Sequence, residues 1–347
     1  MTPRILIIST MRDEAPHLVE WVAHNRAAGA DDILVFSNDC TDGTDDLLDA
    51  MQAVGALTHV RNAVPEGRTP QWAALKQAAD HPLTRLADWI AVLDADEFVN
   101  LRAPLTTLHD LITAIPGADA VVLPWRLFGN AGHVERPQAM TIDAYTRAIA
   151  PDALYPPLSR FFKTLYRKAV MQKSGVHRPK QRAGPPPVWV DGSGRALPAA
   201  LAADDTRILF WGAALATDLV QLNHYSVRSA QDFLLKRGRG LPNHTEKGID
   251  LTYWVERNFN TVADDSIARM ATATRAEYAR LLAIPEVARA QARSDALTRA
   301  TLARMLNDPE TVQLYGRLCL SNGSEPPDAA LSQHLVRLYR TATGGQS

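Results

Sequence analysis

The chain has 347 residues, more than a single hydrophobic core usually accommodates, so we expect one large domain with an appended element, or two domains. Its apolar content of 46%, charged content of 22% and net charge of −1 are ordinary for a globular protein and give no reason to expect a nucleic-acid partner. Two cysteines are too few for a disulfide framework, and no apolar run is long enough for a signal peptide or a membrane-spanning helix. We therefore predict a cytoplasmic protein whose membrane contact would be peripheral, at the inner face.

The first half of the chain alternates short apolar strands with helices. Apolar, β-branched runs predict strands at 4–9, 31–38, 56–60 and 89–94, with a fifth within 118–129. Between them, helices are expected after Pro16, before Gly55 and over 70–80. Strands too apolar to face water, alternating with helices, predict an α/β fold with a mainly parallel sheet covered by helices.

The pattern changes after residue 150. Residues 153–190 contain no Asp or Glu but eight Lys and Arg, and 219–227 reads as one more strand. From about 245 onward the sequence is mostly helical, rich in Ala, Leu and Arg. We therefore predict an α/β domain over 1–240 and a helical C-terminal extension over 241–347.

Three polar clusters follow predicted strands: Arg12–Asp13–Glu14, Ser37–Asn38–Asp39 and Asp94–Asp96–Glu97. Ligands of open α/β sheets bind beyond the carboxyl ends of the strands. These clusters are therefore expected to form one binding edge.

The third cluster, in "WIAVLDADEFVNL", places three carboxylates within four positions. In extended chain Asp94 and Asp96 point to the same side, which suits a hard divalent cation able to bridge two phosphates. The alternative is an acidic strand end that caps the next helix or pairs with a nearby arginine.

"LDADEF" resembles the D-x-D motif of nucleotide-sugar-dependent glycosyltransferases of the GT-A fold. The segments "MRDEAPHLVEWVAHN", "LPWRLFGNAGH" and "NHYSVRSAQDFLLKRGRG" resemble, in the same order, parts of bacterial family-2-like transferases and of the family-92-related group. The resemblance covers roughly residues 4–240. It implies a GT-A domain that moves a sugar from a nucleoside-diphosphate sugar to a saccharide or glycolipid acceptor with inversion, in polysaccharide or glycolipid assembly.

The resemblance implies roles for individual residues at the donor site. Asp94 and Asp96 would hold Mn²⁺ or Mg²⁺ and, through it, the donor diphosphate, and His224 would be a further metal ligand. The alternative for His224 is a structural role, as a histidine hydrogen-bonded beneath the sheet.

The first two strand ends would contact the nucleoside. Arg12 and Asp13 would lie along it, and Asn38 or Asp39 would read the base. Position 13 is Asp where the family usually has Asn, and Ser37 and Asn38 stand where family 2 has paired aspartates. The base is therefore open, with a UDP-sugar favoured.

The remaining site predictions concern basic, aromatic and catalytic residues. His177 and Arg237 would contact the donor, the latter from a flexible basic loop that closes over the diphosphate; a solvated basic face is the alternative. The acceptor would meet Trp125 and His133. An attacking hydroxyl needs a general base; Glu97 and Asp96 are the predicted catalytic carboxylates, and His133, Glu135 and Asp191 are alternatives for the base.

Three other classes share parts of this pattern. A phosphatase of the haloacid-dehalogenase type uses D-x-D after its first strand and continues with Thr or Val, where this chain has Phe98 after about the fourth strand. A nucleotidyltransferase would show a Gly-rich loop in place of "STMRDEA". A non-catalytic sugar- or nucleotide-binding protein would keep the pocket without needing the metal. The oligomeric state is not indicated.

Overall fold

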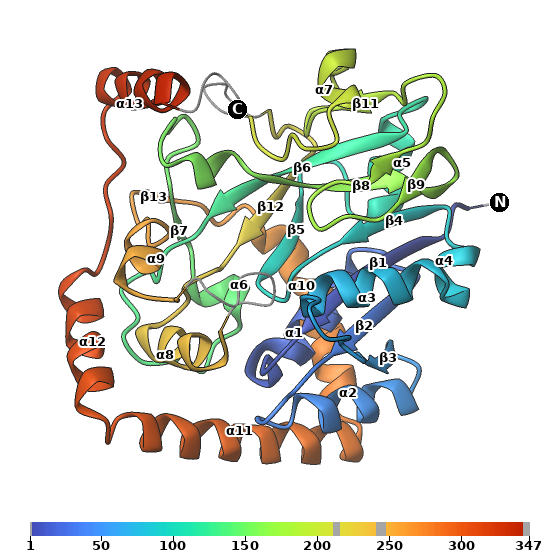
Figure 1. Cartoon of the computed structure of the whole chain (residues 1–347). Coiled ribbons are helices and arrows are strands. Elements are labelled where there is room, and N and C mark those ends of the chain that lie inside the picture. The colour runs from blue at the N-terminus through green and yellow to red at the C-terminus, as the bar shows by residue number, and fades with distance from the viewer. Residues whose placement is uncertain (1, 211–215, 241–247, 343–347) are drawn as a thin grey trace.

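A nine-stranded mixed sheet forms the centre of the molecule (Figure 1). The computed structural model of the chain describes residues 2–210, 216–240 and 248–342. The strands of this sheet are β1 (Ile5–Met11), β2 (Asp32–Ser37), β3 (Thr58–Arg61), β4 (Trp89–Val92), β5 (Glu97–Leu101), β6 (Ala120–Leu127), β8 (Phe162–Arg167), β11 (Trp189–Val190) and β12 (Val220–His224).

The order of the strands, β3-β2-β1-β4-β8-β6-β12-β5, brings most carboxyl ends to one edge. Strands β3, β2, β1 and β4 are parallel, β8 is antiparallel to both β4 and β6, and β12 is parallel to β6. Strand β11 pairs with β6, and β5 runs antiparallel to β12. The predicted α/β fold with a mainly parallel sheet is confirmed, and β5 and β8 are strands that were not predicted.

Helices cover both faces of the sheet, and short strand pairs lie at its margins. The helices are α1 (Ala15–Ala27), α2 (Thr44–Ala53), α3 (Pro70–Ala79), α4 (Pro82–Leu86), α5 (Leu108–Ala114), α6 (Thr141–Ala144), α7 (Ala199–Ala203), α8 (Ala230–Arg239), α9 (Leu251–Val255), α10 (Ala268–Leu282), α11 (Pro285–Met305), α12 (Pro309–Leu320) and α13 (Ala329–Ala342), with 3-10 turns η1 (Pro157–Arg160) and η2 (Lys168–Val170). The short pairs are β7 (Arg147–Ala148) with β13 (Val262–Ala263), and β9 (Met171–Lys173) with β10 (Lys180–Gln181).

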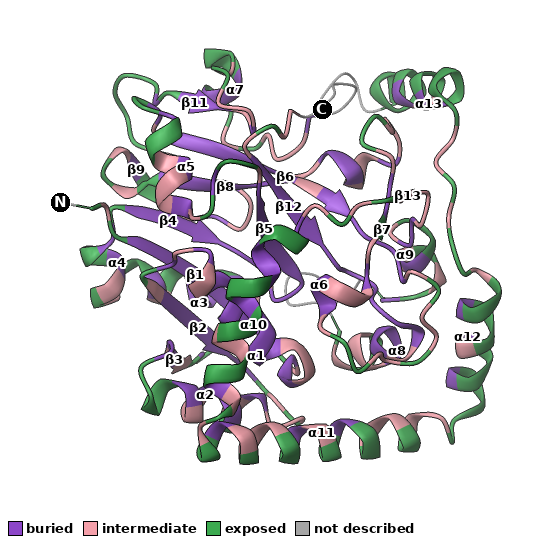
Figure 2. Ribbon diagram, turned by 180° about the vertical axis from the view of Figure 1, so that it is seen from behind, coloured by how far each residue is buried: buried purple, intermediate pink, exposed green. Residues whose placement is uncertain are grey.

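The core consists of two apolar layers, because successive strand residues point to opposite faces. Ile5 and Ile7 of β1 join the layer under α1, α2 and α10, whereas Leu6 and Ile8 join the layer under α3 and α4. Figure 2 shows the strands buried between these helical layers. This accounts for strands that read as continuously apolar.

The C-terminal helices complete the core of the N-terminal part. Helix α10 packs against α1, where His24 Nδ1 lies 3.1 Å from Thr274 Oγ1 in a buried contact. Met270 and Leu281 belong to the same apolar layer as β1. Figure 1 shows α11 running beneath α2 and α8, with α12 leading away along one side. The division at residue 240 remains a prediction. Among the described residues, none of the helices has the length and apolar character needed to cross a membrane.

Candidate active site

The D-x-D carboxylates lie at the carboxyl edge of the sheet, and each is paired with a lysine. Asp94 follows β4 and Asp96 immediately precedes β5, with a turn between them closed by the Glu97 amide donating to the Asp94 carbonyl at 3.0 Å. Asp94 Oδ2 lies 2.9 Å from Lys163 Nζ, and Asp96 Oδ2 lies 2.7 Å from Lys236 Nζ. These lysines supply the positive charge that the carboxylate cluster requires.

Asp96 is nearly buried and held in its charged form. Its Oδ1 lies 3.5 Å from His224 Nε2, opposite the oxygen that Lys236 contacts. Burial raises the pKa of Asp96, but the Lys236 ammonium and the His224 imidazole outweigh it and hold that pKa well below its ordinary value. Burial in turn lowers the pKa of His224, so the imidazole is neutral near pH 7.

Glu97 has no exposed surface and joins the cluster to the sheet. Its Oε2 accepts the backbone N–H of Asp94 at 2.8 Å and lies 3.4 Å from Lys163 Nζ, and its Oε1 accepts Trp125 Nε1–H at 2.7 Å. Burial raises the pKa of Glu97 well above its usual value, whereas these N–H donors favour the charged form. Glu97 thus fixes the positions of Asp94 and Trp125.

Aromatic rings form one wall beside the carboxylates. The centroid of the partly exposed Trp125 ring lies 4.1 Å from that of His224, 5.3 Å from that of His177 and 5.4 Å from that of Phe161. His177 Nδ1 donates to the Phe162 carbonyl at 3.0 Å, which leaves Nε2 with the lone pair. Burial and the Lys163 charge lower the pKa of His177 to about 4, so the ring is neutral at physiological pH.

The described side chains do not fit a metal site of three protein ligands. Among residues 2–210, 216–240 and 248–342, no three His, Cys, Asp or Glu side chains gather as a cation would require. The lysines occupy one oxygen of Asp94 and one of Asp96, and the second oxygen of Asp96 faces His224. Metal ligation by Asp94, Asp96 and His224 remains a prediction.

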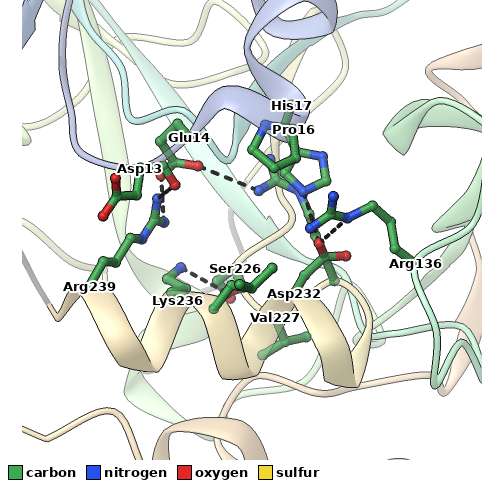
Figure 3. Close-up of a pocket in the computed structure, with 12 residues that line it drawn as sticks. Asp13, Glu14, Pro16, His17, Arg136, Ser226, Val227, Asp232, Lys236 and Arg239 are labelled. Carbon is green, nitrogen blue, oxygen red and sulfur yellow. Dashed lines mark hydrogen bonds and ion pairs between the residues drawn. The ribbon is translucent and has the colours of Figure 1, made fainter. Parts of the chain in front are cut away.

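A charged pocket adjoins Asp96 through Lys236 (Figure 3). One wall is the end of β1 with the start of α1, where Glu14 Oε1 lies 2.5 Å from Arg239. The opposite wall is α8, where Asp232 contacts Arg136 Nε at 2.6 Å and His17 Nε2 at 3.3 Å. Burial lowers the pKa of His17 to about 3, so this histidine is neutral.

Three non-glycine residues around the binding edge adopt left-handed backbone conformations. They are Asp13, Asp39 and Arg228, with φ near 50°. Such strain is found preferentially at functional sites. Arg228 donates to the carbonyl of Ala95 at 3.1 Å and so holds the D-x-D turn.

Asp13 joins the loops after β1 and β2. Its Oδ1 accepts the backbone N–H of Thr41 at 2.5 Å and that of Asp42 at 3.2 Å. The same three residues line a cavity of about 240 Å³ whose other wall includes Thr301 and Arg304 of α11. This cavity shares Asp13 with the charged pocket.

A family model for glycosyltransferase family 92 matches residues 8–189, just over half of the chain. The chain belongs to glycosyltransferase family 92. The matched region contains the D-x-D turn, Trp125, Lys163 and His177. His224 and Lys236 lie beyond it, so the family match does not include the part of the site that contacts Asp96.

Solved structures that resemble this family 92 chain are distant. S. aureus TarS is 16% identical over 48% of this chain and 29% of its own, with a TM-score of 0.31. Glucosyl-3-phosphoglycerate synthase from Mycobacterium tuberculosis, in complex with Mn²⁺, UDP and glucosyl-3-phosphoglycerate, is 14% identical over 49% of this chain and 58% of its own, with a TM-score of 0.28. The chain thus spans less than two thirds of either protein. No curated protein matches it.

Half of the predicted site residues of this family 92 member meet at one place, and the others lie apart from it. The structure brings together Asp94, Asp96, Glu97, Trp125, His177 and His224. His133 instead lies against Tyr145, with ring centroids 5.6 Å apart. Arg237 is exposed on α8, and the flexible basic loop predicted there is wrong because residues 230–239 form a helix.

The residues predicted to contact the nucleoside lie in the loops after β1 and β2. Asn38 is nearly buried, and its Nδ2 lies 3.5 Å from Asp39 Oδ2. Arg12 is exposed, and its carbonyl accepts a hydrogen bond from Arg239 at 2.7 Å. Their contacts with a donor remain predictions.

Lys163 and Lys236 lie in segments predicted to be basic, but their pairing with the carboxylates was not predicted. Lys163 carried a signal, because it interrupts the otherwise apolar strand "FFKTLYR", where a lone cation needs a buried partner. Lys236 was predicted, with Arg237, in a basic segment suited to a diphosphate, but nothing local indicates its pairing with Asp96, because the two residues are 140 positions apart.

Proposed function

We propose that this family 92 chain transfers a sugar from a nucleoside-diphosphate sugar, with a UDP-sugar favoured, to a saccharide or glycolipid acceptor, with inversion. The observation that carries the proposal is the meeting of Asp94, Asp96, His224 and Trp125 at the carboxyl edge of the sheet. Ligands of open α/β sheets bind at this edge, and family membership supports sugar transfer there.

The donor would extend from the loops after β1 and β2 to the D-x-D turn. Arg12, Asp13, Asn38 and Asp39 would contact the nucleoside, beside the 240 Å³ cavity that Asp13 lines. The diphosphate would then reach the charged pocket that Lys236 lines (Figure 3). The Lys236 ammonium also contacts Asp96. Positive groups there would stabilise the departing diphosphate.

The acceptor would stack on Trp125. An indole that is partly exposed and locked by a hydrogen bond from its Nε1–H to Glu97 offers a rigid apolar face of the kind that packs against sugar rings. His177, neutral and 5.3 Å from Trp125 between ring centroids, borders the same face. The contacts of Glu97 and Asp96 with lysine do not favour either carboxylate as the general base.

Calorimetry tests the proposal directly. We would titrate UDP and GDP into the wild type, Asp96→Asn and the control Asp80→Asn, whose exposed carboxylate lies at the end of α3. Each titration would be run with EDTA and again with Mn²⁺. The proposal predicts that one nucleotide binds the wild type and the control, and that Asp96→Asn weakens it.

Turnover separates a transferase from a binding protein. We would incubate UDP-glucose and UDP-galactose with the wild type and a saccharide acceptor, and follow the release of UDP above that seen without acceptor, with Trp125→Ala as the comparison. Release that requires Trp125 supports the proposed acceptor face. Failure of both nucleotides to bind under every condition would overturn the donor site.

A further inference from the structure

We propose that Lys163 and Lys236 together take the electrostatic place of a divalent cation at the D-x-D motif, and that Lys236 is the cation that meets the donor diphosphate. The inference deepens the proposed function and rests on it. It identifies a binding residue and a positioning residue that the motif itself does not name, and it predicts donor binding without metal.

The first step is the charge balance at the motif. The two ammonium groups bring the same two positive charges as one divalent cation. They approach the same side chains a cation would use: Lys163 Nζ lies 2.9 Å from Asp94 Oδ2, and Lys236 Nζ lies 2.7 Å from Asp96 Oδ2. Because charge is already supplied from within the fold, the carboxylates do not depend on an external ion for their compensation.

The second step is that Lys163 cannot readily leave. It is fully buried within β8, and its Nζ lies between Asp94 and Glu97, 3.4 Å from Glu97 Oε2. A metal ion on Asp94 Oδ2 would displace this ammonium, whose side chain is fully buried and cannot move into solvent. A buried charge without its partner is strongly unfavourable. Lys163 is therefore a positioning residue that commits Asp94 to an internal ion pair.

The third step is that Lys236 faces the site. Its side chain is 13% exposed, and it lines the pocket with Arg239 and Asp13 (Figure 3). An ammonium has three N–H donors, and Asp96 Oδ2 at 2.7 Å and the Ser226 carbonyl at 2.8 Å accept two of them. Within the described part of the chain, the third N–H has no hydrogen-bond acceptor and is available for a phosphate oxygen.

The fourth step is that Lys236 is held in place for this task. Asp96 and the Ser226 carbonyl fix the ammonium, and Nζ lies 5.3 Å from the centroid of the Tyr253 ring. Asp96 is itself fixed, because its carbonyl accepts the backbone N–H of Tyr225 at 2.8 Å. A preorganised cation loses little side-chain freedom when the diphosphate arrives.

Calorimetry of UDP binding in EDTA and in Mn²⁺ tests the inference. The wild type should bind UDP in EDTA, with an affinity that Mn²⁺ changes by less than about twofold. Lys236→Met keeps the length of the side chain and removes the charge, so it should weaken UDP binding in EDTA by about tenfold or more, as expected for a charge-assisted hydrogen bond. Lys236→Arg should retain most of the affinity, and the exposed Lys173→Met is the matched control expected to bind as the wild type does.

Electron paramagnetic resonance of free Mn²⁺ gives a readout that needs neither nucleotide nor turnover. The wild type should leave the Mn²⁺ signal unchanged. A signal reduced by the wild type but not by Asp96→Asn would show that the motif binds the cation and would overturn the inference. If UDP binds the wild type only with Mn²⁺, the inference is wrong and the proposed function stands. If neither UDP nor GDP binds under any condition, the proposed function itself fails.

The wild-type titration in EDTA tests the inference even if a variant does not fold. If Lys236→Met folds, as judged by circular dichroism, and binds UDP in EDTA as tightly as the wild type does, the role of Lys236 is wrong.

Discussion

Replacing Lys163 with methionine should expose the energetic role of the buried ion pairs. The substitution keeps most of the side-chain volume but removes an ammonium 2.9 Å from Asp94 Oδ2 and 3.4 Å from Glu97 Oε2. At an effective dielectric constant of about 20, these separations correspond to Coulomb energies of about 5 to 6 kcal/mol each, which desolvation of the three groups largely offsets. The Asp94 side chain is 32% exposed, so solvent compensates part of the loss of its ion pair with Lys163. The Glu97 side chain is fully buried, so solvent does not compensate the loss of its ion pair.

Breaking a buried pair in this way costs about 3 to 5 kcal/mol of unfolding free energy, and we expect Lys163→Met to fall in that range at pH 8. The loss should shrink toward pH 5. Without the ammonium, burial and the Asp94 charge raise the pKa of Glu97 further above its unfolded value, so the folded variant holds a proton that the unfolded chain releases. Its stability is therefore retained at low pH and falls as pH rises toward the folded pKa.

Urea unfolding followed by circular dichroism at pH 5 and pH 8 measures both effects. Lys173→Met, an exposed change in β9, is the control and should stay within about 0.5 kcal/mol of the wild type. Lys163→Met/Glu97→Gln should recover part of the loss at pH 8 and show a weaker pH dependence. A loss below about 1 kcal/mol at pH 8, or one that does not change with pH, would refute this account of the pairs.

Three further changes test separate contacts. Trp125→Phe removes the N–H donor to buried Glu97 and should cost about 1 to 3 kcal/mol in urea unfolding; unchanged stability would contradict the contact. Gly129→Ala should lower Tm, because the added Cβ would lie 2.5 Å from the Phe259 carbonyl oxygen, and overpacking of this kind costs about 1 to 3 kcal/mol. The contacts with Arg136 and His17 hold the pKa of Asp232 below its ordinary value despite burial, so the stability of the wild type should fall as pH drops below about 4. Asp232→Asn should be less stable than the wild type at pH 7 and should lack this part of the acid sensitivity. Parallel pH profiles of the two proteins would show that these contacts contribute nothing.

The parts of the fold that could be predicted are those where one local signal dominates. Strands β1, β2 and β4 are apolar at nearly every position because helices cover both faces of the sheet. Strand β5 was missed because Glu97 and Asn100 make it read as a polar continuation of the motif, although both are buried. Strand β8 was missed because Lys163 interrupts its apolar pattern.

The candidate site likewise contains residues that a local signal predicts and residues that it does not. The carboxylates, Trp125 and His224 could be predicted because each lies at the end of a recognisable strand, and parallel strands bring their carboxyl ends together. The lysine partners depend on which distant strand or helix packs there, which no local pattern records. Arg237 shows the reverse: its basic neighbourhood suggested a phosphate contact, but its side chain is exposed, whereas those of Lys236 and Arg239 line the pocket.

The packing of α10 on α1 has a consequence for biosynthesis. His24 and Thr274, which meet across that interface, are separated by 250 residues. At roughly 5 to 20 residues per second, α1 leaves the ribosome about 12 to 50 s before the helix that covers it. During that interval the apolar side of α1, with Leu18 and Val22, lacks part of its native covering. The nascent chain therefore leaves part of its first helix uncovered throughout that interval, and this part of the core closes only after α10 has been synthesised.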